Sequence, residues 1–555
     1  MDEKIKIYCK NNQKHQEFRT GVSLLEIYQV MDIQLSGQVM CAAVNNKMES
    51  LQFVCYKPKD IEFIGMDHPS GMRTYVRSLC FILAKAIHDL FPKRKLYFEH
   101  ALSKGYYCKV ENDCELTSED VECIKKHMQE IIAADVAFIK HERPTTEVID
   151  LFRQKHTEDK ALLLQTVGEA YSTYYSLDDY VDYFYGYLLP STGWIYLFDI
   201  EKSHEGVLLR IPNRTNLSEL EPYVNQEKMF AVFQDLRVWQ KAVSLSNVGE
   251  LNRSIQDGTI STSLQIAEVL QERKIAKIAD DIFHKVTEGV RVVLIAGPSS
   301  SGKTTFCKRL QLELMASTLH PVSISLDDYY VNRIDTPLDE NGEYDYESLY
   351  AIDLETFNED LQKVLAGEKV PLPTYDFQKG ERVYRGNTVQ LDQRSILVME
   401  GIHGMNPLLV PHIPAEKIYK IYVSALTSIS LDDHNWIPTT DNRLIRRIVR
   451  DYQFRGYSAK ETISRWASVR KGEDKWIFPY QENADAMFNS AMLYELAALR
   501  KMAEPILKEV TQMDEEYPEA YRLLKFLHYF KPIDKEALPN TSLLREFVGG
   551  SSFCY

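Results

Sequence analysis

The chain has 555 residues, of which 45% are apolar and 26% are charged. These proportions are ordinary for globular protein and exclude a disordered or fibrous chain, and at about 150 residues per domain the length predicts three to four domains. Lysine and arginine total 65 against 80 aspartates and glutamates, a net charge of −15. The chain therefore lacks an overall basic field, which argues against nucleic acid as a partner.

The sequence carries no feature of a membrane or secreted protein. No apolar run approaches the roughly 18 residues that a spanning helix needs, so we expect no membrane partner. The residues after Met1 contain no apolar signal region. The nine cysteines are scattered, without a C-x-x-C pair, which is typical of a reducing compartment. We therefore expect a cytoplasmic protein.

The front half predicts mixed helix and strand structure. Residues 1–66 alternate apolar and polar side chains in short runs, which is typical of a small α+β module. Residues 74–91 and 118–134 each carry an apolar stripe at helical spacing. Residues 170–212 are rich in tyrosine and strand formers, which favours a sheet there.

The second half predicts a linking helix followed by a parallel sheet. Residues 261–289 form a long amphipathic stretch that we expect to be helical. Residues 291–490 alternate strand and helix patterns, which indicates a parallel sheet with helices on both faces. The expected division is 1–66, 67–240, a helical linker at 241–289, 290–490 and a helical C-terminal segment at 491–555.

The strongest motif spans residues 297–304 and satisfies G-x-x-x-x-G-K-[ST] at every fixed position. A buried-strand pattern precedes it at 292–296, and a helix pattern follows at 305–316. In such a loop, backbone N–H groups wrap a phosphate, the lysine reaches the β- and γ-phosphates, and the final hydroxyl binds Mg²⁺. The sequence therefore predicts a nucleoside triphosphate site formed by Gly297, Pro298, Ser299, Ser300, Ser301, Gly302, Lys303, Thr304 and Thr305.

Acidic residues end two further strand patterns. Asp327 follows the pattern at 322–326, and Glu400 follows the pattern at 395–399. Ligands bind at the carboxyl ends of parallel strands, where a carboxylate can accept a proton from an attacking hydroxyl or help to hold Mg²⁺. We expect Thr304, Asp327 and Glu400 to hold the metal, although an aspartate after a strand can also simply cap a turn.

An arginine-rich helix pattern spans residues 441–451. Arg443, Arg447 and Arg450 recur at i, i+4 and i+7 and so share one helix face. In an acidic protein, a basic face of this kind favours a lid whose guanidinium groups stabilise a transferring phosphoryl group. A solvated charged face is the alternative.

Five blocks of sequence together resemble the uridine kinase and phosphoribulokinase family. They are the phosphate loop, Ser325–Tyr330, Pro373–Phe377, Glu400–Ile402 and the arginine-rich helix, and their order and spacing match that family. The resemblance covers roughly residues 290–490. It implies an α/β P-loop kinase domain, with a parallel sheet and helices on both faces, that uses ATP and Mg²⁺ to phosphorylate the 5′-hydroxyl of a nucleoside.

The resemblance also implies roles for individual residues. Asp327 falls at the position of the catalytic base, and Lys303, Arg447 and Arg450 fall at positions that neutralise the phosphates. Arg455 matches a further lid arginine at the nucleotide. The positions implied to bind the acceptor are those of Asp327, Tyr330, Glu347, Tyr375 and Arg447.

The front half resembles the N-terminal domains of threonyl-tRNA synthetases. Residues 1–66 resemble the β-grasp module called the TGS domain through Gly21–Ile27 and Ala42–Asn46. The next segment resembles the α+β editing domain of the same enzymes through Leu90–Pro92 and Gly105–Tyr107.

The metal-like constellation of that editing domain is missing. Its two histidine positions hold Arg77 and Phe81, and its cysteine and final histidine positions hold Phe184 and Leu188. Phenylalanine and leucine can neither bind metal nor activate water. We therefore expect a degenerate editing-like domain that serves binding, regulation or oligomerisation.

The leading hypothesis is a Mg·ATP-dependent nucleoside kinase that acts on uridine or cytidine. A base-reading histidine of the family aligns near Gly380 and a lid arginine with Tyr457, which leaves the preferred base open. A second hypothesis keeps the kinase and changes the acceptor to a sugar phosphate, glycerate or pantothenate. A third is a nucleotide-switched or RNA-sensing protein. A homo-oligomer is plausible by analogy with the family.

Overall fold

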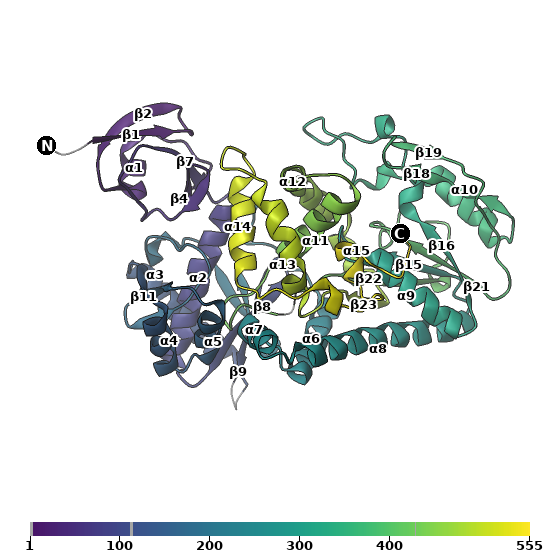
Figure 1. The fold of residues 1–555 in the computed structure, drawn as a ribbon, viewed down its shortest axis with the longest axis horizontal. Coiled ribbons are helices and arrows are strands. Elements are labelled where there is room, and N and C mark those ends of the chain that lie inside the picture. Colours follow the sequence, from purple (N-terminus) through teal and green to yellow (C-terminus); the bar gives the residue numbers. More distant parts are fainter. Residues whose placement is uncertain (1–3, 112–114, 428, 555) are drawn as a thin grey trace.

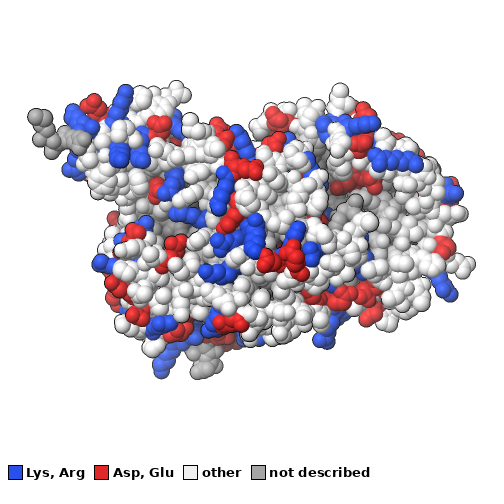
Figure 2. Space-filling view, viewed as in Figure 1, with Lys and Arg blue, Asp and Glu red and all other residues white. Residues whose placement is uncertain are grey.

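The computed structural model describes residues 4–111, 115–427 and 429–554. The N-terminal module lies at one end and a parallel sheet at the other, with the C-terminal helices between them (Figure 1). Acidic and basic side chains are interspersed over the face shown in Figure 2. Among the described residues, none of the helices is long and apolar enough to cross a membrane.

The N-terminal module is a five-stranded mixed sheet crossed by one helix. The sheet order is β2-β1-β7-β4-β5, and only the β1–β7 pair is parallel. Helix α1 begins with a capping box between Ser23 and Glu26 and buries Leu24 and Ile27 in the module core. The elements are β1 (Lys4–Cys9), β2 (Lys14–Arg19), β3 (Val22–Ser23), α1 (Leu24–Val30), β4 (Val39–Val44), β5 (Lys47–Glu49), β6 (Val54–Cys55) and β7 (Lys59–Gly65).

The following α+β region centres on the long helix α2 (Pro69–Leu90), in which every residue from Tyr75 to Ile87 except Arg77 is buried. An antiparallel sheet of order β13-β14-β9-β8 and helix α3 (Ser118–Ala133) share its core. A second sheet has the order β10-β11-β12. The remaining elements are β8 (Lys95–Leu102), β9 (Gly105–Glu111), β10 (Ile139–Pro144), α4 (Thr145–Gln154), α5 (Glu158–Val167), β11 (Tyr171–Leu177), β12 (Tyr180–Asp182), β13 (Asp199–Ser203) and β14 (Gly206–Arg210).

Three helices lead from this region to the parallel sheet. They are α6 (Glu227–Val243), α7 (Val248–Gln256) and α8 (Ile260–Thr287). The long helix expected at 261–289 is confirmed as α8, which runs along the molecule to the sheet (Figure 1). Its residues Ile275 and Ile278 pack in one core with Val293 and Ile295 of the central strand.

The second half is confirmed as a parallel sheet with helices on both faces. Its order is β16-β21-β15-β22-β23, and every pair is parallel. Val293 and Ile295 of β15 face α8 and α9, whereas Val292 and Leu294 face α6 and α10. The elements are β15 (Val292–Ala296), α9 (Lys303–Ala316), β16 (His320–Ser325), α10 (Leu354–Leu365), β17 (Val370–Pro371), β18 (Thr374–Asp376), β19 (Glu381–Val383), β20 (Thr388–Val389), β21 (Ser395–Glu400), β22 (Ile418–Ser424), α11 (Thr439–Phe454), α12 (Ala459–Trp476) and β23 (Ala486–Asn489).

The C-terminal helices lie in the middle of the molecule. Helices α13 (Glu495–Lys508), α14 (Tyr517–His528) and α15 (Arg545–Val548) share a core with α4, α5, α7 and α11. The turn after α13 contacts the N-terminal module, where Asn46 donates to the backbone oxygen of Gln512 (2.9 Å). Arg73 of α2 pairs with Glu519 of α14 (3.3 Å). The segment expected as a helical tail thus connects all parts of the chain.

Candidate active site

The carboxyl ends of three neighbouring strands bring the phosphate loop and two acidic residues to one edge of the sheet. Glu400, the last residue of β21, pairs with Ile295 of β15 on one side and with Ser325 of β16 on the other. The phosphate loop starts just after Ile295, and Asp327 follows Ser325 closely. Because the paired strands are in register, the phosphate loop, Asp327 and Glu400 lie close together at the carboxyl edge of the sheet.

The loop between β15 and α9 has a backbone that few sequences can adopt. Gly302 caps α9 with a φ of +80°, and Ser300 has a φ of +59°, both in the left-handed region. A side chain at Gly297 would collide with the carbonyl oxygen of Val423. The Ser300 and Ser301 hydroxyls are buried without a hydrogen-bond partner in the described part of the chain. A curved loop with free hydroxyls at a helix N-terminus fits a phosphate.

Lys303, Thr304 and Glu400 form the centre of the site. Burial lowers the pKa of Lys303, although the charges of Glu400 and Asp327 act to raise it. The Lys303 Nζ donates a hydrogen bond to the backbone oxygen of Pro298 (3.2 Å). The Thr304 hydroxyl donates to Glu400 Oε1 (3.3 Å). Burial also raises the pKa of Glu400 to about 7. A divalent cation would favour the ionised carboxylate.

One hydroxyl and two carboxylates make an oxygen donor set of the kind that Mg²⁺ prefers. Among the residues that the structure describes, no three His, Cys, Asp or Glu side chains group as metal ligands. Mg²⁺ usually takes only one or two carboxylates and completes its shell with water and substrate phosphates. Thr304, Asp327 and Glu400 therefore fit Mg²⁺ bound together with a nucleotide.

The two aspartates after β16 have different surroundings. Both lie in a 3-10 turn (Leu326–Tyr329). The charge of Asp327 acts on Lys303 and Glu400. In contrast, Asp328 Oδ1 accepts a hydrogen bond from the Tyr375 amide of β18 (3.1 Å). Asp327 thus faces the phosphate loop, while Asp328 anchors a neighbouring strand, a distinction that the sequence did not reveal.

The predicted acceptor residues lie beside Asp327. The Tyr330 and Tyr375 rings meet edge to face with centroids 5.8 Å apart. Burial raises the pKa of Tyr330, and the nearby Asp327 and Glu347 charges raise it further. Burial raises the pKa of Glu347 to about 7, assisted by the Glu473 carboxylate. Glu347 Oε2 is buried without a hydrogen-bond partner among the described residues, so it is available to a ligand hydroxyl.

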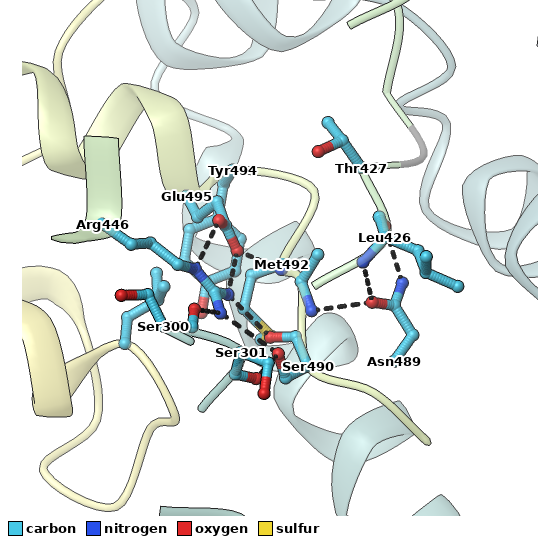
Figure 3. Close-up of polar contacts among 12 residues, drawn as sticks. Ser300, Ser301, Leu426, Thr427, Arg446, Asn489, Ser490, Met492, Tyr494 and Glu495 are labelled. Atoms are coloured by element: carbon cyan, nitrogen blue, oxygen red, sulfur yellow. Dashed lines mark hydrogen bonds and ion pairs between the residues drawn. The ribbon is translucent and has the colours of Figure 1, made fainter. Parts of the chain in front are cut away.

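Two arginines of α11 contact the phosphate loop from inside the protein and do not form part of a lid. Arg443 is buried, donates to the Ser299 backbone oxygen (3.0 Å) and pairs with Glu473. Arg446 lies among Ser300, Ser490 and Glu495 (Figure 3). Its Nε donates to Glu495 Oε1 (2.8 Å), and its Nη2 donates to the Ser490 backbone oxygen (3.0 Å). The expectation that Arg443 shares the lid face is therefore corrected, because its guanidinium is inside the protein.

The other three arginines surround one carboxylate beside the loop. Arg447, Arg450 and Arg455 approach Asp451 at 3.3, 2.7 and 3.7 Å. Arg447 Nη1 also donates to Ser299 Oγ (3.0 Å). Repulsion by Arg450 lowers the pKa of Arg455, and burial with Arg450 lowers that of Arg447. Three cations around one anion leave a surplus of positive charge for a polyphosphate.

Sequence reasoning missed several residues of the site. Glu473 and Glu495, the partners of the buried arginines, lie 30 and 49 residues beyond them, so no local pattern could reveal them. His403 is fully buried close to Lys303, and burial lowers its pKa to about 4. Its position three residues after Glu400 was the only available signal.

The positions of the lost editing constellation are filled by packing. Arg77 is half-buried, donates to the Tyr187 backbone oxygen (2.5 Å), and has a pKa lowered to about 10 by desolvation of its guanidinium. The Phe81 and Phe184 rings pack at a tilt, with centroids 5.4 Å apart. Leu188 is buried in the same core. These side chains leave no donor set for a hydrolytic metal at that place.

A parallel sheet, a phosphate loop after its central strand and carboxylates at the neighbouring strand ends define a P-loop domain of the kinase class. Residues 292–496 match the model of the Phosphoribulokinase / Uridine kinase family. The C-terminal region is therefore a P-loop kinase-like domain with the pattern of that family.

The N-terminal region is similar to threonine–tRNA ligases. The ligase of Clostridium kluyveri is 30% identical over 190 residues, which are 34% of this chain and 30% of that protein. The chain thus spans about 30% of the length of this curated relative.

Two solved structures are similar to part of the chain. One described as a “possible uridine kinase” from Bacillus stearothermophilus is 19% identical, covers 38% of this chain and 97% of its own, and has a TM-score of 0.26. A D-glycerate 3-kinase from Cryptococcus neoformans is 15% identical, with corresponding coverages of 46% and 92% and a TM-score of 0.20.

Proposed function

We propose that the protein transfers the γ-phosphoryl group of Mg·ATP to the 5′-hydroxyl of a pyrimidine nucleoside such as uridine or cytidine. The observation that carries this proposal is the convergence of Lys303, Asp327 and Glu400 beside the Glu347 carboxylate and the rings of Tyr330 and Tyr375. The Glu347 Oε2 atom is buried and has no hydrogen-bond partner among the described residues. One side of this arrangement suits a polyphosphate, and the other suits a base and its ribose.

The residues that would hold the nucleotide are those of the phosphate loop from Gly297 to Thr305, with Arg455 beside it. Thr304, Asp327 and Glu400 would hold Mg²⁺, which when bound neutralises phosphate charge. Lys303, Arg447 and Arg450 would oppose the charge on the transferring group. The surplus of positive charge around Asp451 and the lysine at the loop support these roles.

Asp327 is the proposed catalytic base. The acceptor oxygen forms a bond to the γ-phosphorus while the bond from that phosphorus to the β,γ-bridging oxygen breaks, and the acceptor proton passes to the Asp327 carboxylate. ADP and the nucleoside monophosphate are the products. Alignment and charge neutralisation supply most of the rate in such transfers, which is why the site relies on fixed cations rather than on a covalent nucleophile.

For the front half, we propose a domain that binds or regulates without hydrolysis. The half-buried Arg77 and the buried Phe81, Phe184 and Leu188 support this proposal, because they occupy the positions that an editing metal would need. The domain division at residues 66, 240, 289 and 490 is part of the same proposal.

The test is ADP release from the full chain with Mg·ATP and a panel of uridine, cytidine, purine nucleosides, glycerate, sugar phosphates and pantothenate. We expect turnover with a pyrimidine nucleoside. Asp327→Asn should lower kcat by a factor of about 10² to 10⁴ and, because it also removes a proposed Mg²⁺ ligand, should weaken Mg·ATP binding by a smaller factor. Lys303→Ala should lower both kcat and the affinity for ATP. Turnover with glycerate or pantothenate and with no nucleoside would reject the nucleoside assignment. Full activity of Asp327→Asn would reject the assigned base.

A further inference from the structure

The C-terminal segment places a carboxylate on the phosphate loop. Glu546 of α15 accepts two hydrogen bonds through Oε2, from the Thr305 amide (3.2 Å) and from the Thr305 hydroxyl (2.7 Å). Thr305 lies in the first turn of α9, directly after the lysine and threonine of the loop motif. The amides of this turn are donors that such a loop offers to nucleotide phosphates.

The Glu546 carboxylate also acts on the centre of the site. Its charge raises the pKa of Glu400, after the larger effects of burial, Lys303 and Asp327, and it opposes the fall in the pKa of Lys303. Glu546 therefore lies within the electrostatic field of the groups that we assign to ATP and Mg²⁺. A carboxylate there resembles a phosphate in its charge and in its use of helix N-terminal donors.

The segment that carries Glu546 is fixed by packing. Leu543, Leu544, Phe547 and Val548 are each almost fully buried. The Arg446 guanidinium lies over the Phe547 ring, 4.8 Å from its centroid, and Gln453 Nε2 donates to the Phe547 backbone oxygen (2.9 Å). In contrast, Glu546 itself is only half-buried. Its side chain can leave Thr305 by rotation while the buried neighbours stay in place.

We propose that Glu546 is an internal competitor of the nucleotide. Its carboxylate takes the Thr305 donors in the free protein and must give them up when the ATP phosphates bind to the first turn of α9. When ATP binds, the two Thr305 hydrogen bonds pass from the Glu546 carboxylate to a phosphate. The carboxylate must then move away from the phosphate, because both groups are negatively charged. Breaking the Glu546 contacts costs free energy, so the segment lowers the affinity for ATP. This inference rests on the proposed nucleotide site.

The test compares wild type with Glu546→Gln by calorimetric titration of the full chain with Mg·ATP. Glutamine keeps the size of the side chain and removes its charge. We expect Glu546→Gln to bind Mg·ATP about tenfold more tightly, the change that about 1.4 kcal/mol produces. Glu546→Ala, which also removes the hydrogen-bond acceptor, should bind at least as tightly as wild type. The control is Glu536→Gln, which changes the charge equally at an exposed position of the same segment and should leave the affinity unchanged.

Each other outcome overturns the inference in a distinguishable way. If Glu546 only caps α9, Glu546→Gln will melt at a lower temperature without ATP and will bind Mg·ATP equally or more weakly. If the effect is only one of net charge, Glu536→Gln will show the same gain as Glu546→Gln. If wild type and every variant fail to bind Mg·ATP, the proposed nucleotide site fails, and the competition fails with it.

Discussion

At the scale of single residues, two buried carboxylates dominate the candidate site. Burial raises the pKa of Glu347 and of Glu400 to about 7. A folded-state pKa above the unfolded value of about 4.3 means that the folded protein binds the proton more tightly. This contribution to stability is fully present below about pH 4 and is lost as the pH rises through about 7. At neutral pH and above, these two buried carboxylates therefore lower the stability of the free protein.

Glu347→Gln tests this relation. At pH 5 the wild-type side chain is largely neutral in the folded protein, so the variant should differ by no more than about 1 kcal/mol in free energy of unfolding. At pH 8 the buried wild-type carboxylate is ionised, and the variant should be more stable by about 1–3 kcal/mol. Denaturant unfolding at the two pH values measures the difference. An equal change at both, or a change like that of the exposed control Glu343→Gln, would contradict the assigned pKa.

At the scale of elements, α11 joins the phosphate loop to α13. Arg446 and Glu495 are both almost fully buried, and their pair is completed by Ser490 and the Ser300 backbone (Figure 3). Removing one partner of a buried pair leaves an unpaired charge in the protein interior. The helix therefore fixes the loop through the buried pair of Arg446 and Glu495.

Arg446→Met should lower the free energy of unfolding by about 3–5 kcal/mol. The double variant Arg446→Met/Glu495→Leu should recover a large part of that loss, because it removes both charges together. The control is Lys460→Met, which removes an exposed lysine that pairs with Asp514 (2.7 Å) and should cost less than about 1 kcal/mol. Urea unfolding measures all three. A loss in the single variant no larger than that of Lys460→Met would show that the pair is not essential.

At the scale of the whole molecule, a buried charge network joins the two halves. Lys160 of α5 lies 3.0 Å from Asp182 of β12 and 2.9 Å from Asp432 in the loop before α11. Burial opposes charge on Asp182, but His434 and Lys160 hold its pKa well below the ordinary value. Beside this network, a cavity of about 1040 Å³ opens between the editing-like region, α6, α7 and the same loop. The position of that loop therefore depends on both halves.

Lys160→Met should destabilise the protein by about 3–5 kcal/mol, because it leaves two buried carboxylates without their shared cation. It should also speed hydrogen exchange in residues 429–437 and in β12 more than elsewhere. The exposed neighbour Lys155 provides the control, and Lys155→Met should alter neither property. Faster exchange spread evenly over the chain would refute a local link between the halves.

Much of the fold can be predicted from local sequence patterns. The strand before the phosphate loop, the motif itself and the helix after it follow from short-range pattern, as does the long helix α8, because periodicity and loop chemistry act over a few residues. The carboxylates Asp327 and Glu400 are predictable for the same reason, since Glu400 ends a strand and Asp327 lies two residues after one.

Contacts between distant segments were decided only by the tertiary structure. Helical spacing grouped Arg443 with Arg447 and Arg450, but packing places its guanidinium in the interior against Glu473. Glu546, more than two hundred residues beyond the loop, reaches Thr305 because four buried apolar neighbours hold its segment there. The sequence by itself determined a nucleotide loop on a parallel sheet. Which charges surround that loop depended on long-range burial, which no local pattern records.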